Sequence, residues 1–303
     1  MNAEPDGSGS SMSDSTVLAF MNEVAGGRRL LDAVKASVAE GATEVAVAAP
    51  QNVPAAGQIV TEDEVRDAAQ SRVDVTQAVF AANGIDSVGA VMDPHSPLAL
   101  DDAIRAFKPS RVFVSCLAET RFGPLRKDLV EWVRGRTSAE VVHIPVRLED
   151  DAVAHGITHT LVVATQTVAT DDLLNRLTER AAERPQRYTF VCPRSGAISR
   201  EAVCDRLATT LATMYGKEID ATGQPMSPEP FAAVQNAIEH YRIDDILIST
   251  FAGQRSAWLD DGLIERVQAI TDKPVEHVES RAEGAGPTGD ASAQQPAAVG
   301  AGA

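Results

Sequence analysis

The chain has 303 residues, of which 44% are hydrophobic and 4% aromatic, and its formal net charge is −16. This length suggests two domains, each large enough to bury a core of its own. The acidic balance argues against nucleic acid as a partner, because a phosphate-binding surface needs clustered Lys and Arg, but it leaves room for a local anion site at an Arg or a helix N-terminus.

A first unit is predicted at residues 16–147, after a polar stretch at 1–15 that is expected to be disordered. Within it, short apolar strands alternate with amphipathic helices. The strands are expected at residues 16–20, 44–50, 87–91, 111–117 and 140–146. The buried stripe of the first helix is expected to consist of Leu30, Leu31, Val34 and Val38. The second helix should begin after Thr61, which forms a T-x-x-E capping box with Glu64.

A second unit, residues 159–280, repeats this order after a short acidic linker at 148–158. Its strands are expected at residues 159–165, 187–193, 218–221, 245–251 and 274–278. The last helix of the unit is expected to carry Leu259, Leu263 and Val267 in one stripe. The tail, residues 281–303, is rich in Ala, Gly, Ser, Gln and Pro and is predicted to be disordered.

The two units are related by an internal duplication. Residues 102–144 superimpose on residues 236–278 without a gap, since 277 − 143 = 134 and 237 − 103 = 134. Nearly continuous apolar strands between helices indicate parallel strands covered on both faces. The fold class is therefore α/β, with two tandem doubly wound five-stranded parallel-sheet domains. We expect the final strands, Val141–Val146 and Val275–Val278, to pack against each other, so that one chain mimics a dimer.

Cysteine usage and hydropathy indicate the compartment. Cys116, Cys192 and Cys204 are odd in number and have no CxxC spacing, which favours a reducing environment. No window approaches the ~18 apolar residues of a membrane span, and the N-terminus has no hydrophobic signal core. The sequence thus predicts a cytoplasmic protein with neither a membrane nor a nucleic-acid partner.

Ligands of doubly wound sheets bind at the carboxyl ends of the strands, where the strand order reverses. This rule selects the loops after strands one and four of each unit. The residues proposed there for ligand binding are Asn22, Arg121, Gln166, Thr250, Gly253, Gln254, Arg255 and Ser256. An Arg in this place could hold a phosphate or carboxylate bidentately. The alternative is that the Arg pairs with an acidic neighbour or caps a helix.

The tandem units, with a small-residue loop after strand four, resemble the universal stress protein family. The segment ISTFAGQRSAWLDDGLIERV is similar to that region in a tandem actinobacterial group. The resemblance implies an adenine nucleotide alpha hydrolase-like fold. ATP-binding members carry Gly-x-x-Gly, nine residues, then Gly followed by Ser or Thr. Unit one offers only Gly123. Unit two has Gly253 and Gly262, but Leu263 follows the second glycine in place of Ser or Thr. The family's acidic residue after strand one is replaced by Asn22 and Gln166.

No catalytic residue and no metal ligand is nominated. The G-x-S-x-G elbow of hydrolases is absent. His143 and His277 match across the repeat, but a metal site needs further ligands at a recognisable spacing. We expect both to be partly buried histidines on edge strands.

Three functions remain open from the sequence. The favoured one is a non-catalytic stress-response-type binding or regulatory protein with a degenerate nucleotide or anion site in unit two. The second is a nucleotide-binding enzyme, a hydrolase or nucleotidyl transferase, and the third is a pure interaction scaffold. ATP or another nucleotide is the candidate cofactor, although its motif is degenerate. The partners considered are a small anionic ligand, the second unit of the same chain, and a further copy of the chain.

Overall fold

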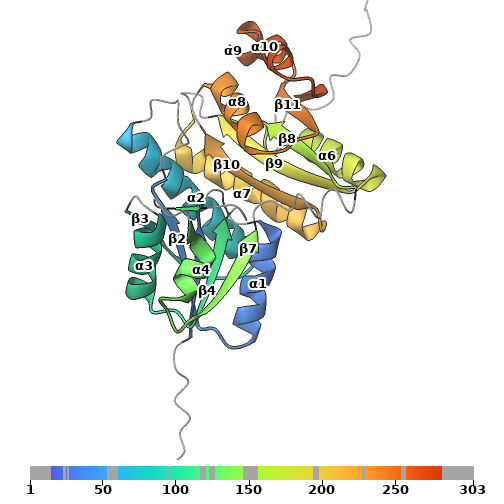
Figure 1. Cartoon of the computed structure of the whole chain (residues 1–303). Coiled ribbons are helices and arrows are strands. Elements are labelled where there is room, and N and C mark those ends of the chain that lie inside the picture. The colour runs from blue at the N-terminus through green and yellow to red at the C-terminus, as the bar shows by residue number, and fades with distance from the viewer. Residues whose placement is uncertain are drawn as a thin grey trace, which may run out of the picture.

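The computed structural model describes most of both units. The described residues are 15–22, 25, 27–52, 61–93, 96–116, 121–122, 127–145, 156–193, 198–226, 229–253 and 257–281. Residues 1–14 and 282–303 of the expected disordered stretches, residues 148–155 of the expected linker, and residues 146–147 at the end of unit one lie outside this set. In Figure 1, unit one, coloured blue to green, lies below unit two, coloured yellow to red.

Unit one consists of a parallel sheet with helices on both faces. Its elements are β1 (Thr16–Met21), α1 (Arg28–Ala39), β2 (Glu44–Pro50), α2 (Glu62–Ala82), β3 (Val88–Met92), α3 (Ser96–Phe107), β4 (Arg111–Cys116), β5 (Arg121–Phe122), β6 (Lys127–Asp128), α4 (Leu129–Arg134) and β7 (Glu140–Pro145). The predicted capping box is present, since the Thr61 hydroxyl accepts from the Glu64 N–H and the Glu64 carboxylate accepts from the Thr61 N–H.

Unit two repeats the architecture. Its elements are β8 (Thr158–Val163), α6 (Asp171–Glu183), β9 (Gln186–Pro193), α7 (Arg200–Gly216), β10 (Asp220–Met226), α8 (Pro230–His240), β11 (Asp245–Phe251), α9 (Ala257–Asp260), α10 (Leu263–Ile270) and β12 (Val275–Ser280). Arg281, placed by the sequence in the disordered tail, continues from β12 and pairs with Asp172.

The strand order confirms the predicted fold class. The sheets run β3-β2-β1-β4-β7 and β10-β9-β8-β11-β12, and every pairing within them is parallel. The same order in both units matches the duplication read from the sequence. In each sheet the order reverses between the first and fourth strands, β1 and β4 or β8 and β11.

The protein has three hydrophobic cores, and successive residues along a strand face different ones. In β1, Leu18 and Phe20 face a core closed by α3 and α4, whereas Val17, Ala19 and Met21 face a second core. That second core is continuous with the face of the unit-two sheet covered by α6 and α7. A third core lies between the other face of unit two and helices α8 and α10. One hydrophobic core therefore joins the two units.

The units meet through α2 and α7, which lie next to each other in Figure 1. On α2, Ser71, Asp74 and Val75 form a second stripe beside the one that covers the unit-one sheet. Asp74 pairs with Arg200 of α7, and the Thr222 hydroxyl of β10 donates to the carbonyl of Ala25 at 2.9 Å.

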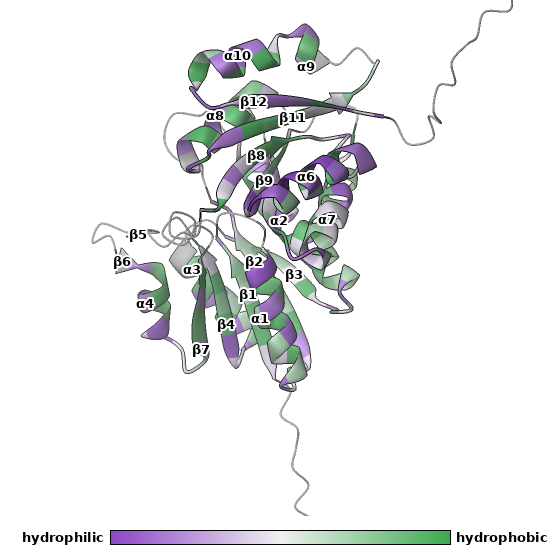
Figure 2. Cartoon of the chain, turned by 90° about the vertical axis from the view of Figure 1, so that its right-hand side faces the viewer, coloured by the Kyte–Doolittle hydropathy of each residue, from purple (hydrophilic) through white to green (hydrophobic). Residues whose placement is uncertain are grey.

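The expected contact between the final strands is therefore wrong. β7 and β12 each form one edge of a separate sheet, and Figure 2 places them at opposite ends of the molecule. The physical reason lies in α2, which buries side chains on more of its circumference than one sheet can cover. Pairing α2 with α7 buries that second stripe.

Three local expectations also differ from the structure. Val38 is 39% exposed, because the helix buries Ser37 instead, whose hydroxyl accepts from Arg111. The third strand of unit two lies at Asp220–Met226 rather than 218–221. This strand contains Gly223 and Pro225, which are not typical of a strand in the sequence, but an edge strand tolerates Pro. The last helix is split into α9 and α10, because Gly262 adopts a left-handed conformation with φ 65°.

Candidate functional site

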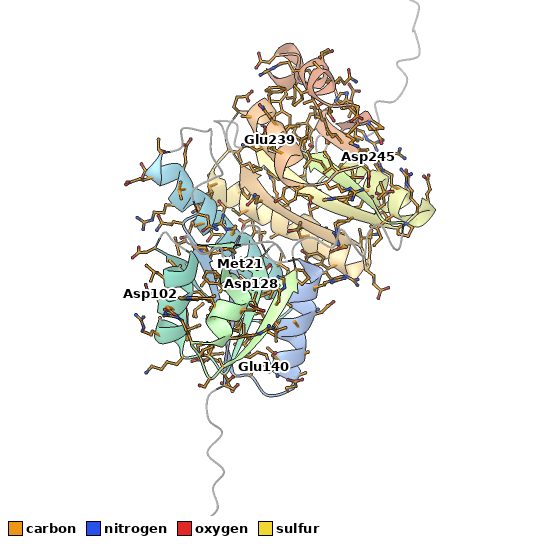
Figure 3. All side chains as sticks on the ribbon, viewed as in Figure 1. Met21, Asp102, Asp128, Glu140, Glu239 and Asp245 are labelled. Carbon is orange, nitrogen blue, oxygen red and sulfur yellow. The ribbon has the colours of Figure 1, made fainter. Side chains whose placement is uncertain are left out.

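The two switch points lie in different environments. Figure 3 places Met21, the last residue of β1, at the end of unit one that faces unit two, and Glu140, the first residue of β7, at the far end. Because the strands are parallel, the carboxyl ends of the unit-one sheet face unit two. The ligand edge predicted for unit one is therefore next to the interface between the units.

Asn22 anchors the switch point of unit one. It is 3% exposed, its N–H donates to the Ser115 carbonyl at 2.9 Å, and its own carbonyl accepts from the Asn52 amide. Asn22 thus ties the ends of β1, β2 and β4 together. A backbone used in this way is not open to a ligand phosphate.

The N-terminus of α1 lies against unit two. Its N-cap is Gly27, which makes no side-chain cap, and a Cβ added at Gly27 would lie 3.5 Å from the Ala221 carbonyl of β10. The helix begins with Arg28 and Arg29 and has no acidic residue in its first turn. A helix N-terminus attracts anions through its free N–H groups. Here the neighbouring group is a carbonyl of the other unit.

Arg121 lies in a short hairpin that the sequence did not predict. Its backbone belongs to β5, which pairs antiparallel with β6, so that Arg121 lies opposite Asp128. Asp128 caps α4 through hydrogen bonds from the N–H groups of Val130 and Glu131. The placement of the Arg121 side chain lies outside the described part of the chain.

In unit two the predicted residues are dispersed. Gln166 is exposed after β8, whereas Thr250 is 5% exposed and its hydroxyl lies 2.8 Å from Nε2 of His277. Gly253 is exposed and left-handed, with φ 67°. Gln254, Arg255 and Ser256 lie outside the described residues, so the structure places neither the proposed guanidinium nor its neighbours.

Threonine hydroxyls that the sequence analysis did not select hold the loop after β8. Thr165 donates to the Pro193 carbonyl at 2.6 Å, Thr167 to the Ser249 carbonyl at 3.0 Å and Thr170 to the Thr167 carbonyl at 2.8 Å. All three are buried. Their hydrogen bonds fix the loop to the ends of β9 and β11, and small polar residues after strand one were the only sequence signal for them.

Carboxylates occupy the N-terminus of α6, the helix that follows β8. Asp171 and Asp172 lie in its first turn, and Arg281 binds Asp172 through its backbone N–H and its guanidinium, at 2.7 and 2.6 Å. These hydrogen bonds lower the pKa of Asp172 to about 2. The positive end of the helix dipole thus already faces two carboxylates, and a phosphate would have to compete with Asp172 for the Arg281 guanidinium.

The buried charges of unit two lie at the opposite end of its sheet. Arg180 is 7% exposed and bonds to Asp245 and to Glu276, the latter at 2.7 Å, while Arg176 bonds to Glu276 at 2.6 Å. Asp245 is the first residue of β11 and is labelled in Figure 3. Burial raises the pKa of Glu276, but hydrogen bonds from both arginines outweigh it, so the pKa is lowered overall. This network is internally paired and stabilises the fold.

The two predicted edge-strand histidines occupy equivalent positions. His143 lies on β7 and His277 on β12, and both are partly buried, as expected. Each reaches the last buried residue of the fourth strand: Nε2 of His143 lies 3.4 Å from Sγ of Cys116, and Nε2 of His277 lies 2.8 Å from Thr250 Oγ1. The repeat spacing contained this signal, since 250 − 116 and 277 − 143 are both 134.

Among the described residues, no group of three or more His, Cys, Asp or Glu side chains is arranged to hold a metal ion. Within the same part of the chain, none of the helices combines the length and the apolar character needed to cross a bilayer.

Comparison with known proteins does not assign a family. No protein-family model matches the sequence, and no curated protein matches it. Among solved structures, the universal stress protein from Archaeoglobus fulgidus DSM 4304 is 13% identical, with 88% of this chain and 96% of that chain covered and a TM-score of 0.34. The NadR protein in complex with NAD and AMP-PNP is 8% identical, with 88% and 93% covered and a TM-score of 0.27. Neither likeness is close enough to assign a function.

Proposed function

We propose that this chain is a non-catalytic binding or regulatory protein of the stress-response type, in which any small anionic ligand binds at unit two. The observation that carries the proposal is that the described groups at both switch points bind one another instead of forming a phosphate cradle. Such a cradle needs successive backbone N–H groups free to face the anion.

Unit one supports this proposal through its position. The backbone of Asn22 is bound to β4 and to Asn52, and Ala25 accepts a hydrogen bond from Thr222 of the other unit. A nucleotide at this edge would have to displace contacts between the units. Unit one therefore serves to hold its partner unit rather than to bind a ligand.

Unit two supports the proposed anion site through the backbone conformation of Gly253, which follows β11. Gly253 is exposed and left-handed, so the chain turns there with a backbone accessible to a ligand. In the sequence, Gln254, Arg255 and Ser256 follow directly and supply one cation and two hydrogen-bonding groups. The carboxylates of Asp171 and Asp172 make the α6 side unfavourable for an anion. Arg255 is accordingly the residue we assign to anion binding.

Two alternatives predict different outcomes. A nucleotide hydrolase or transferase would turn over nucleotide, and a pure interaction scaffold would carry no small molecule at all. Mass spectrometry of small molecules released from the purified protein distinguishes these alternatives from a binding protein. An anion that is retained but not converted is the outcome expected for the proposed function.

Replacing Arg255 by Ala should weaken binding of that anion by roughly 1.5 to 3 kcal/mol, the scale of a charge-assisted hydrogen bond. Arg121→Ala is the matched control and should change little, since the sequence places Glu119 close to Arg121 and a carboxylate repels an anion. Calorimetric titration measures both, with inorganic phosphate as the probe if no anion is released. Equal weakening by the two substitutions, or weakening by Arg121→Ala alone, would refute the assignment to unit two.

A further inference from the structure

Cys116 and His143 form a thiol–imidazole pair at the carboxyl end of the unit-one sheet. Sγ of Cys116 lies 3.4 Å from Nε2 of His143, and the same Nε2 lies 3.2 Å from the Cys116 carbonyl. Cys116 is the last residue of β4, and His143 lies on the adjacent edge strand β7. If the thiol proton moves to the imidazole, the ring N–H faces both the thiolate and the carbonyl oxygen. This arrangement stabilises the thiolate.

The second unit has an equivalent pair in which a threonine hydroxyl takes the place of the cysteine thiol. At the repeat-matched position, Thr250 Oγ1 lies 2.8 Å from Nε2 of His277. An alcohol does not ionise near neutral pH, whereas a thiol beside an imidazole does. The duplication therefore provides an internal comparison in which the backbone frame is the same and only unit one carries a nucleophile.

The other two cysteines lie in environments that suppress reactivity. Burial raises the pKa of Cys192 far above its usual range, and burial also raises the pKa of Cys204 to about 11. Cys192 lies in β9, in the interior of its sheet, and Cys204 lies in α7 between the units. Cys116 is also buried, at 1% exposed, but its histidine is on an edge strand, where local opening costs less than in a central strand.

We propose that Cys116 is a modification site, a thiol activated by His143 that reacts with small electrophiles and hydroperoxides. With a haloacetamide, the thiolate sulfur attacks the carbon that bears the halogen, an S–C bond forms and halide leaves. With a hydroperoxide, the sulfur attacks one oxygen, an S–O bond forms and the O–O bond breaks. The sulfur is oxidised to a sulfenic acid, and the leaving alkoxide, or hydroxide when the oxidant is hydrogen peroxide, takes the proton from the imidazolium and departs as an alcohol or as water.

The test measures the rate at which iodoacetamide alkylates each cysteine of the full-length, reduced chain at neutral pH. Peptide mass spectrometry reports the modified fraction of each cysteine over time. We expect Cys116 to react about tenfold faster than Cys192 or Cys204, and His143→Gln to remove most of that advantage. Treatment with hydrogen peroxide and trapping with dimedone should label the same residue. Circular dichroism establishes that His143→Gln is folded.

A gain-of-function variant keeps the test decisive if His143→Gln fails to fold. Thr250→Cys places a thiol beside His277 and should create a second fast-reacting site, which Thr250→Cys/His277→Gln should lose. Ser249→Cys is the control, because Ser249 is also buried but bonds to Ser280 rather than to a histidine, and a thiol there should react slowly. The proposal is overturned if Cys116 reacts no faster than Cys204, or if Thr250→Cys reacts no faster than Ser249→Cys.

Discussion

Replacing Arg180 by Met is expected to lower the free energy of unfolding by about 3 kcal/mol, the lower end of the range for breaking a buried ion pair, because it leaves the buried Asp245 carboxylate with only the exposed Arg184 guanidinium, 3.9 Å away. Arg180 binds Asp245, Glu276 and the Thr160 hydroxyl, and its side chain is 8% exposed. Asp245 is 8% exposed and is the partner most dependent on it. Urea denaturation followed by circular dichroism measures the loss.

Arg176→Met is the matched control for this prediction. Arg176 shares Glu276 with Arg180, but its side chain is 39% exposed and Glu276 keeps its second arginine after the substitution. The expected cost is below about 1 kcal/mol, the range of exposed ion pairs. Adding Asp245→Asn to Arg180→Met should recover part of the stability, since it removes the uncompensated charge. Equal costs for Arg180→Met and Arg176→Met would contradict the buried network.

Gly223→Ala is expected to cost about 1–3 kcal/mol, the range for overpacking a well-filled core. Gly223 lies opposite Phe190 in the β9–β10 ladder, and an added Cβ would lie 2.6 Å from Cβ of Phe190 and 2.9 Å from its carbonyl oxygen. Relief requires β10 to move, and β10 also contacts unit one through Thr222. Thermal unfolding should show the loss.

Gly216→Ala provides the comparison for Gly223→Ala. Gly216 is the last residue of α7, has an ordinary φ, and a Cβ there meets nothing within 4 Å. Ala at such a position should be neutral or stabilise the helix by up to ~1 kcal/mol. If Gly223→Ala were as harmless as Gly216→Ala, the close approach of β9 and β10 would have to be wrong.

The sequence predicted the sheets well because each strand carries its own local signal. The apolar runs and the capping box at Thr61 are properties of short segments, and both were found in the structure. β10 was misplaced because an edge strand containing Gly223 and Pro225 lacks an apolar run. The other edge strands, β3, β7 and β12, retain apolar residues and were located from them.

The packing between the units could not be read from the sequence. The stripe on α2 that includes Ser71 and Asp74 reads as a solvated face, and only the structure shows Arg200 of α7 opposite it. The same limit applies at the switch points. Asp172 and Arg281 are 109 positions apart, so their pairing depends on the fold and not on any motif. Spacing indicated where ligand-binding groups should lie, but not which of these groups are already paired with other residues of the protein.

Isothermal titration calorimetry with ATP and Mg²⁺ tests most directly whether the described groups at the two switch points form a phosphate cradle. Because those groups bind one another, we expect no saturable heat up to about 1 mM ATP, which corresponds to a binding free energy weaker than about −4 kcal/mol. Stoichiometric binding with a Kd of about 1 μM or tighter, near −8 kcal/mol, would show that a nucleotide site exists and would contradict the statement that the groups at the switch points form no phosphate cradle.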